Sequence, residues 1–194
     1  FATASLRQLV EAGENVVAVV TAPDKPAGRG QKLSSSSVKQ YAESVGLKVL
    51  QPTNLKSEEL LHELNLLKPD LAIVVAFRML PKVVWNLPKH GTFNLHASLL
   101  PRYRGAAPIN WAIINGEKET GVTTFFINEN IDTGNILFQE KVEIRNDETA
   151  GSLHDKIMNV GAQLVLKTAK AIKDGNNNPI PQNEVSELKA APKI

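Results

Sequence analysis

The sequence contains no cysteine among its 194 residues. Disulfide bonds within the chain, thiolate zinc sites and a cysteine nucleophile are therefore excluded, and the composition fits a reducing compartment. No apolar run approaches the roughly 18 to 20 residues that a membrane span needs, and we expect no signal peptide before the first helix. The net charge is only +2, so a role in nucleic-acid binding would have to come from a local patch of cations.

The chain is also poor in histidine. The four histidines show none of the paired spacings of metal ligands, so we expect no metal site; they are His62, His90, His96 and His154. With 42% apolar residues, a chain of this length can bury one full hydrophobic core. We therefore predict one domain over 1–175, followed by an irregular segment over 176–194.

Helix and strand patterns alternate along the chain. Helical spacing and capping residues predict helices at 1–13, 38–45, 57–67, 108–115 and 149–173. Continuous β-branched runs predict buried strands at 15–21 and 71–77, and shorter or alternating runs predict strands at 48–50, 92–100, 121–127 and 135–144. This order predicts an α/β fold with a doubly wound, mostly parallel, Rossmann-like sheet and helices on both faces.

One stretch, 91–108, combines a strand with a loop rich in proline and arginine. Strict alternation over 92–97 places Asn94 and His96 on the same face. Pro101 has no backbone N–H to give to a sheet, so the strand should end just before it. The polar pair then sits at the carboxyl end of a strand, where open α/β sheets usually bind ligands. Taken alone, such a pair is most often a hydrogen-bonded structural pair.

The residues N-L-H-A-S-L-L-P-R-Y-R-G-A-A-P, which span 94–108, resemble the signature of the folate-dependent formyltransferases, most closely of the members that act on methionyl-tRNA. The resemblance covers essentially the whole chain and implies the formyltransferase fold for a catalytic domain at 1–175. It also implies 10-formyltetrahydrofolate as co-substrate and initiator methionyl-tRNA as acceptor. Members open with a strand, so we expect this sheet to lack its first, central strand. Because members continue into a small β-barrel, 176–194 is expected to be a linker towards that absent domain.

Asp132 lies in the loop N-E-N-I-D-T-G between two predicted strands. Alone, Asp-Thr-Gly is typical of a turn that satisfies its own backbone. The triplet also occurs in aspartic proteases, which need two such carboxylates, whereas this chain has one. The resemblance implies that Asp132 is the acid of the formyltransferase site, although Asn135 stands where members usually carry another acid.

Formyl transfer to an amine needs donors to a developing oxyanion and a route for the amine proton. We expect the Asn94 amide and the His96 imidazole to donate to the oxyanion, each donor contributing on the order of 3 kcal/mol. Asp132, if close to His96, would favour the imidazolium and help to remove the amine proton through water.

The resemblance also implies where the folate lies. Residues that follow two neighbouring strands are expected to border it: Ser98, Leu99, Leu100 and Pro101 after one strand, and Arg78, Met79 and Leu80 after the other. The second group lines the pterin pocket in members, largely through backbone groups, and many members carry glycine where Arg78 stands. Met79 and Leu80 could equally be core residues.

The segment 22–37 holds two prolines, two glycines and four serines, and we expect a long loop without secondary structure. It closely matches the tRNA-contacting loop of the methionyl members. The predicted contacts are its cations Lys25, Arg29 and Lys32, and the alternative is an ordinary solvated loop.

Three classes of function stay open. One is formyl transfer to aminoacyl-tRNA, and the second is the same chemistry on a small amine, such as a glycinamide nucleotide or an amino sugar, or hydrolysis of the formyl-folate. The third is a non-enzymatic RNA-binding module, against which the joint presence of Asn94, His96 and Asp132 argues. The loop favours the first class. We expect a bacterial cytoplasmic protein, with an organelle as the alternative, and neither a membrane nor an obligate protein partner is indicated.

Overall fold

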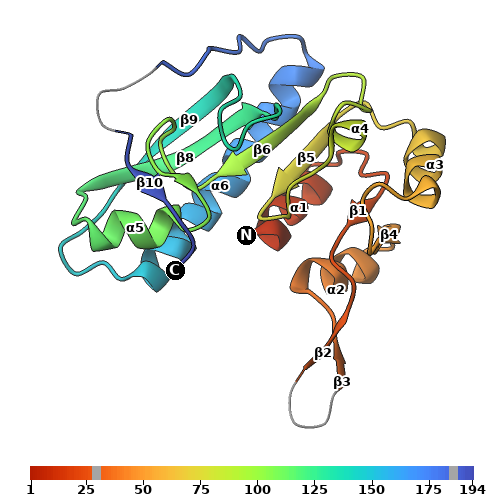
Figure 1. The fold of residues 1–194 in the computed structure, drawn as a ribbon, viewed down its shortest axis with the longest axis horizontal. Coiled ribbons are helices and arrows are strands. Elements are labelled where there is room, and N and C mark those ends of the chain that lie inside the picture. The colour runs from red at the N-terminus through yellow and green to blue at the C-terminus, as the bar shows by residue number, and fades with distance from the viewer. Residues whose placement is uncertain (28–31, 184–187) are drawn as a thin grey trace.

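The computed structural model describes residues 1–27, 32–183 and 188–194 (Figure 1). The helices are α1 (Ala2–Glu11), α2 (Ser37–Ser44), α3 (Glu58–Leu67), α4 (Lys82–Trp85), α5 (Pro108–Ile114) and α6 (Ala150–Lys173). The strands are β1 (Val19–Val20), β2 (Lys25–Ala27), β3 (Lys32–Ser34), β4 (Val49–Leu50), β5 (Ala72–Val75), β6 (Thr92–His96), β7 (Arg104–Gly105), β8 (Glu119–Phe126), β9 (Ile136–Glu143) and β10 (Ala190–Ala191). None of the helices in these described ranges is long and apolar enough to cross a membrane.

The central sheet has four strands in the order β5-β6-β8-β9. The β5–β6 pair is parallel, and β8 and β9 extend the sheet antiparallel. A separate parallel pair, β1–β4, lies beyond β5 on the side of α3 (Figure 1). The predicted Rossmann-like α/β class is confirmed. The β1–β4 pair is hydrogen-bonded as a sheet apart from β5-β6-β8-β9, and the expected lack of a central strand stays a prediction.

Two predicted strands differ from our expectation. Residues 15–21 form a strand only at Val19–Val20, which pair with Val49 and Leu50 of β4. The strand predicted at 71–77 is reduced to β5, and its residues are half-buried rather than fully buried. Within the described residues no strand pairs with the outer edge of β5, so β5 is an edge strand of the central sheet.

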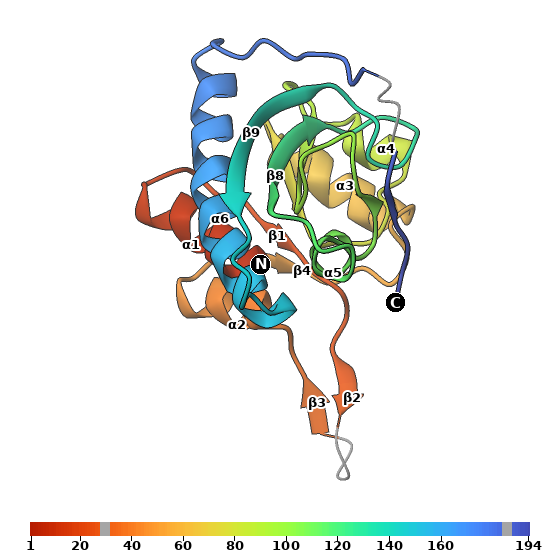
Figure 2. The same cartoon turned by 90° about the vertical axis from the view of Figure 1, so that its left-hand side faces the viewer.

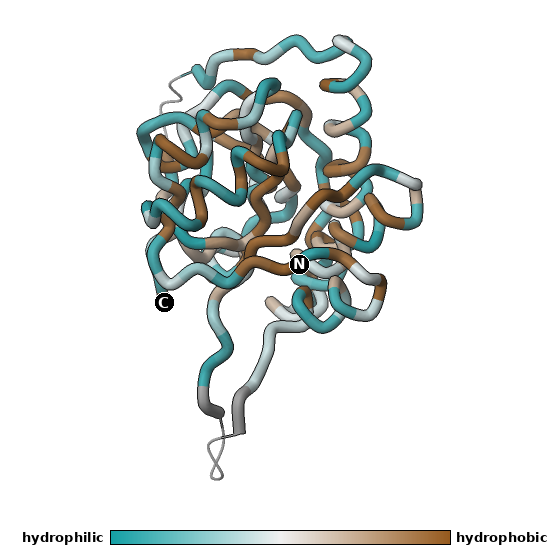
Figure 3. The backbone as a smooth tube through the Cα atoms, turned by 90° about the vertical axis from the view of Figure 1, so that its right-hand side faces the viewer, coloured by the Kyte–Doolittle hydropathy of each residue, from teal (hydrophilic) through white to brown (hydrophobic). Residues whose placement is uncertain are grey.

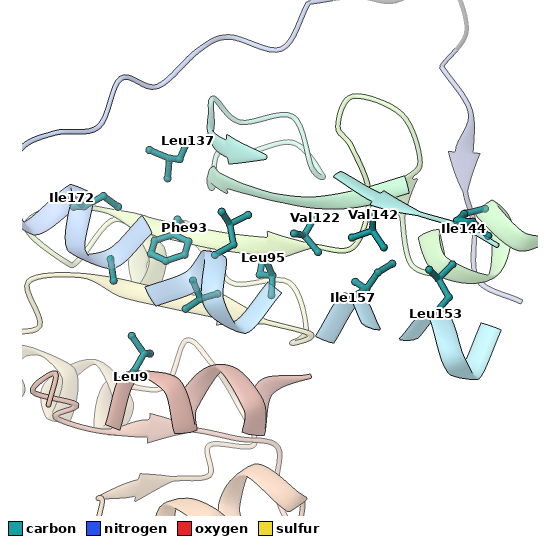
Figure 4. Packing of buried hydrophobic residues seen from close by; sticks show 14 residues of the cluster. Leu9, Phe93, Leu95, Val122, Leu137, Val142, Ile144, Leu153, Ile157 and Ile172 are labelled. Atoms are coloured by element: carbon teal, nitrogen blue, oxygen red, sulfur yellow. The ribbon is translucent and has the colours of Figure 1, made fainter. Parts of the chain in front are cut away.

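The core lies between the sheet and α6, which packs on β8 and β9 and is covered in turn by α1 (Figures 2 and 4). The helix starts at a capping box in which Thr149 and Ser152 exchange hydrogen bonds. The predicted apolar face is largely confirmed; its fully or nearly buried members are Leu153, Ile157, Leu164, Thr168 and Ile172. Gly161 lets the helix approach β6, because a Cβ there would lie 2.9 Å from Leu95. Burying each leucine or isoleucine contributes roughly 1.5–3 kcal/mol, so this face anchors β6 firmly.

The segment 22–37 is not the structureless loop that we expected. Its arms β2 and β3 pair as an antiparallel hairpin, with Lys25 opposite Ser34. The backbone hydrogen bonds between the arms give the segment regular structure without any apolar alternation in the sequence. The hairpin projects away from the body of the domain (Figure 2). Hydrophobic stretches are concentrated in that body, whereas the described arms are hydrophilic or of middling hydropathy (Figure 3).

The chain after α6 returns across the domain and ends beside α5 (Figure 1). There β10 pairs in parallel with β7, and Trp111 Nε1 donates to the backbone oxygen of Pro192. Our expectation of an irregular segment is therefore wrong at 190–191. The assignment of 176–194 as a linker stays a prediction.

Candidate active site

His96 is the last residue of β6 and is only 6% exposed. Its Nε2 lies 2.7 Å from the backbone oxygen of Tyr103. Because a carbonyl oxygen only accepts hydrogen bonds, Nε2 must carry a proton and donate it. Neutral His96 then has a bare Nδ1, so Nδ1 is the nitrogen that takes and gives the second proton.

The Asp132 carboxylate faces that second nitrogen. Its Oδ2 is 3.7 Å from Nδ1 of His96 and accepts a 2.9 Å hydrogen bond from the backbone N–H of Gly105. A separation of 3.7 Å is too long for a direct hydrogen bond but short enough for a favourable ion pair once His96 is protonated. The Asp132 side chain is only 13% exposed, so solvent screens the pair little. The Asp132 carboxylate therefore lies within ion-pair distance of Nδ1 of His96.

The conformation of Asp132 is strained. Its φ is +52°, in the left-handed region, which costs on the order of 1–3 kcal/mol for a residue other than glycine. The carboxylate does not satisfy its own turn, since its hydrogen bond goes to Gly105, 27 positions away in the sequence. The turn is held instead by Asn128, whose Oδ1 accepts from the backbone of Asn130 and from Thr133. This geometry favours a site residue over the turn interpretation.

Asn94 lies two residues before His96 on β6, on the face that alternation predicts. Its backbone is held centrally in the sheet, between Val74 of β5 and Phe125 of β8. The side chain is half-buried, and it makes no side-chain hydrogen bond to any residue within the described part of the chain. Its amide N–H groups are therefore free to donate to a ligand beside His96.

The loop after β6 is attached to the antiparallel half of the sheet. Thr123 donates to the backbone oxygen of Ser98 at 2.6 Å, and Gln139 donates to that of Leu100 at 2.9 Å. The Ser98 hydroxyl donates inward to the oxygen of Arg102 at 2.7 Å, and Ser98 is fully buried. Of the four residues expected to border the folate, Ser98 and Leu100 are buried, which leaves the half-buried Leu99 and Pro101 as side chains able to contact a ligand.

The second predicted folate segment follows β5. Val75 pairs with Leu95, so this segment leaves the sheet beside His96. The guanidinium of Arg78 donates to the backbone oxygens of Pro52 and Thr53, at 2.6 and 3.1 Å, and thus ties two loops together. Met79 is not a core residue, because it is 67% exposed.

Two of the three predicted tRNA contacts lie in the arms of the hairpin. Lys25 is exposed at the start of β2, and Lys32 is the first residue of β3. Arg29 falls at 28–31, outside the described residues.

A cluster of hydrogen bonds around Glu117 holds Tyr103, whose backbone oxygen accepts the hydrogen bond from His96. The Oε1 atom of Glu117 accepts from the hydroxyl of Tyr103 at 2.5 Å, from Lys189 at 2.7 Å and from Arg102 at 2.9 Å. Burial alone would raise the pKa of Glu117, but the hydrogen bonds from Lys189 and Tyr103 and the charge of Arg102 hold the pKa below its usual value. Burial, together with the bond to Glu117, raises the pKa of the Tyr103 phenol. The cluster thus keeps Tyr103 neutral and in place.

Sequence reasoning missed four residues of this site. Tyr103 and Gly105 stand in the signature that we singled out, yet they act through a backbone carbonyl and a backbone N–H. Glu117 and Lys189 carried no pattern that would have marked them. Among the described residues, no group of three or more His, Cys, Asp or Glu is placed to hold a metal ion. The side chains at the end of β6 and on the Asp132 turn offer imidazole hydrogen bonding and proton transfer, and Asn94 offers amide hydrogen bonding.

Comparison with known proteins agrees with this chemistry. Over its whole length the chain is 59% identical to a methionyl-tRNA formyltransferase of Parabacteroides distasonis and 56% identical to one of Flavobacterium johnsoniae. It spans 61% and 62% of those relatives. Among solved structures, it superposes with a TM-score of 0.77 on a phosphoribosylglycinamide formyltransferase from Anaplasma phagocytophilum, at 22% identity and covering 100% of this chain and 95% of the other. The formyl transferase family model matches residues 1–169, so the chain belongs to the formyl transferase family.

Proposed function

We propose that this chain is the catalytic domain of an enzyme that transfers a formyl group from 10-formyltetrahydrofolate to the amino group of initiator methionyl-tRNA. The observation that carries the proposal is the meeting of His96 and Asp132 at the end of β6, beside the free amide of Asn94. The high identity to methionyl-tRNA formyltransferases, across the whole chain, supports the choice of acceptor. Residues 1–175 form the catalytic domain in this proposal, 176–194 lead towards a further domain, and the enzyme acts in the bacterial cytoplasm.

Each of the three polar residues has a separate task. The amine nitrogen attacks the formyl carbon, and the Asn94 amide and the Nδ1–H of protonated His96 donate to the oxygen that becomes negative. Asp132 stabilises the imidazolium and accepts the amine proton through water. The bond between the formyl carbon and N10 of the folate then breaks, and the proton taken from the amine passes through water to N10, so the transfer neither gains nor loses a proton overall. No covalent intermediate with the protein is required.

The two loops at the carboxyl ends of β5 and β6 supply the folate contacts. Leu99 and Pro101 offer side chains on one side, and Met79 with the backbone of 78–80 offers an apolar surface on the other. The Arg78 guanidinium already bonds to Pro52 and Thr53, so Arg78 acts by bracing this loop rather than by reaching the folate.

The hairpin supplies the tRNA contacts. It stands away from the domain and begins with the exposed Lys25, a position suited to reaching a phosphate backbone (Figure 2). Lys25, Arg29 and Lys32 place three positive charges within eight residues of a chain whose net charge is only +2, and such local charge is what a phosphate backbone attracts. An acceptor as large as tRNA needs such a reach, whereas a small amine does not.

The test uses the full-length protein, initiator methionyl-tRNA and 10-formyltetrahydrofolate. Wild-type protein should produce N-formylmethionyl-tRNA, detected by mass analysis of the amino acid released from the tRNA. His96→Ala and Asp132→Asn should each lower kcat by about 100-fold or more, as loss of such groups does elsewhere. His62→Ala, an exposed histidine on α3, is the matched control and should be unaffected.

Three results would contradict the proposal. Formylation of a glycinamide nucleotide or an amino sugar but not of tRNA would reassign the acceptor, and release of formate without any acceptor would indicate a hydrolase. If no formyl group leaves the folate at all while tRNA still binds, the non-enzymatic RNA-binding module would be the better description.

A further inference from the structure

One side chain joins the two segments that surround the Asp132 carboxylate. Gln182 comes from the chain that returns after α6, in the extended stretch between Ile180 and the end of the second described range. Its Nε2 donates to the backbone oxygens of Asp132 and Gly134, at 2.9 and 2.8 Å. Its Oε1 accepts from Nε and Nη2 of Arg104, at 3.2 and 2.7 Å. The Gln182 amide is thus bonded at both its donor and its acceptor end.

Both of these segments act on the carboxylate directly. The turn that ends at Gly134 carries Asp132 itself, and the residue after Arg104 is Gly105, whose N–H donates to Asp132 Oδ2. A shift of either segment would change the separation of 3.7 Å between Asp132 Oδ2 and His96 Nδ1. Gln182 therefore sets how the two segments lie relative to each other, although its side chain does not touch the carboxylate.

The chemistry of the two segments demands an amide at this position. Backbone oxygens accept only and the Arg104 guanidinium donates only, so a side chain between them has to present a donor on one side and an acceptor on the other. A glutamate would lack the donor, and a lysine would lack the acceptor. Glutamine satisfies both partners without adding a charge next to Asp132.

The strained turn needs such a restraint. Asp132 has its φ at +52°, a conformation that persists only where the surroundings hold it. Asn128 holds the start of the turn, through Asn130 and Thr133. At the other end Gly134 is pressed against β8, since a Cβ there would lie 1.6 Å from the oxygen of Phe126. Gln182 donates to the backbone oxygens of Asp132 and Gly134, in the second half of the turn.

We propose that Gln182 is a positioning residue for the Asp132–His96 pair. It acts through the backbone of Asp132 and Gly134 on one side and through Arg104 and Gly105 on the other. This inference rests on the proposed function for its effect on catalysis, but the geometry that it predicts can be measured independently.

The experiment replaces Gln182 with methionine in the full-length protein, which keeps the length of the side chain and removes both hydrogen-bonding ends. Gln163→Met is the matched control, because Gln163 is exposed on α6. We expect Gln182→Met to lower kcat for formyl transfer by about tenfold or more. KM for the formyl-folate should stay within about twofold of the wild-type value, because folate contacts lie on the other loops. The NMR signals of the His96 ring should move in Gln182→Met and stay in place in Gln163→Met.

A second variant guards against a folding defect. Gln182→Glu keeps the size and the acceptor for Arg104 but loses the donor to Asp132 and Gly134, so it should fold and show the same loss of kcat and the same movement of the His96 signals. The inference is overturned if either folded variant keeps both the kcat and the His96 signals of Gln163→Met. If wild-type protein does not formylate tRNA, the proposed function fails, while the His96 signals still decide whether Gln182 positions the pair.

Discussion

Replacing Glu117 with glutamine tests whether the cluster beneath Tyr103 stabilises the site. The substitution keeps the shape of the side chain and one oxygen acceptor, but it removes the negative charge that three donors share. The buried phenol of Tyr103 loses most, since a hydrogen bond to a charged group contributes about 1.5–3 kcal/mol and part of it survives with an amide. Lys189 and Arg102 are 34% and 41% exposed, so each of these ion pairs contributes at most about 1 kcal/mol.

The expected loss is about 2 kcal/mol in the free energy of unfolding at neutral pH, or roughly 4–8 °C in Tm for a chain of this size. The pH dependence of the free energy of unfolding gives a second test. The pKa of Glu117 is lowered in the folded state from its usual value of 4.5, so its contribution is present above pH 4.5 and is lost as the pH falls through the folded-state pKa. The difference between wild type and Glu117→Gln should therefore be full at neutral pH and shrink in acid.

Urea unfolding followed by circular dichroism, at neutral pH and below pH 4, measures both quantities. Glu119→Gln is the matched control, because Glu119 forms an ion pair with Lys141 in which both side chains are about half exposed or more. The reasoning is refuted if Glu117→Gln costs no more than Glu119→Gln at neutral pH, or if its cost is the same at both pH values.

Two further predictions concern other parts of the chain. Lys25→Ala should weaken tRNA binding and reduce the slope of log K against log salt by roughly 0.7 to 1, whereas Lys56→Ala, at an exposed lysine outside the hairpin, should leave the slope unchanged. Fluorescence titrations of tRNA at several salt concentrations measure both slopes. Equal slopes for wild type and Lys25→Ala would argue against the hairpin contact. Hydrogen bonds from Lys156 and Ser152 lower the pKa of Glu148 from 4.5 to about 2, so the stability that Glu148 lends to the start of α6 should be complete above pH 4.5 and lost as the pH falls through about 2. Between pH 4.5 and about 2, the Tm of Glu148→Gln should depend less on pH than that of wild type. Asp155→Asn, at an exposed residue, is the control and should behave like wild type. The same pH dependence of Tm in all three proteins would contradict the role of Glu148.

The elements that sequence predicted best are those whose pattern follows directly from burial. The apolar face of α6 repeats every three or four residues because one side of the helix covers β8 and β9. The alternation around Asn94 and His96 was readable for the same reason, since Phe93 and Leu95 occupy the opposite, buried face of β6. Both predictions needed only the local sequence and the position of the core.

The elements that sequence missed depend on partners far along the chain. Residues 15–21 look like one long strand by composition, yet only Val19 and Val20 pair, with the two residues of β4 about 30 positions further along the chain. The hairpin of β2 and β3 was missed for another reason, since its arms are neighbours in the sequence but carry no alternating apolar pattern. Gln182 lies 50 positions from Asp132 and 78 from Arg104, so no spacing within the sequence could have connected them.

Much of the candidate site is built from backbone groups, and this explains why its signature extends past the residues with reactive side chains. The carbonyl of Tyr103 fixes the ring of His96, and the N–H of Gly105 orients Asp132. At Gly105 φ is +123°, and a Cβ there would lie 2.5 Å from the oxygen of Ala191. Any larger residue would therefore push β10 away from β7 and move the N–H that Asp132 needs. A glycine with no chemistry of its own is thus required to position the Asp132 carboxylate, and the returning chain is part of the same constraint.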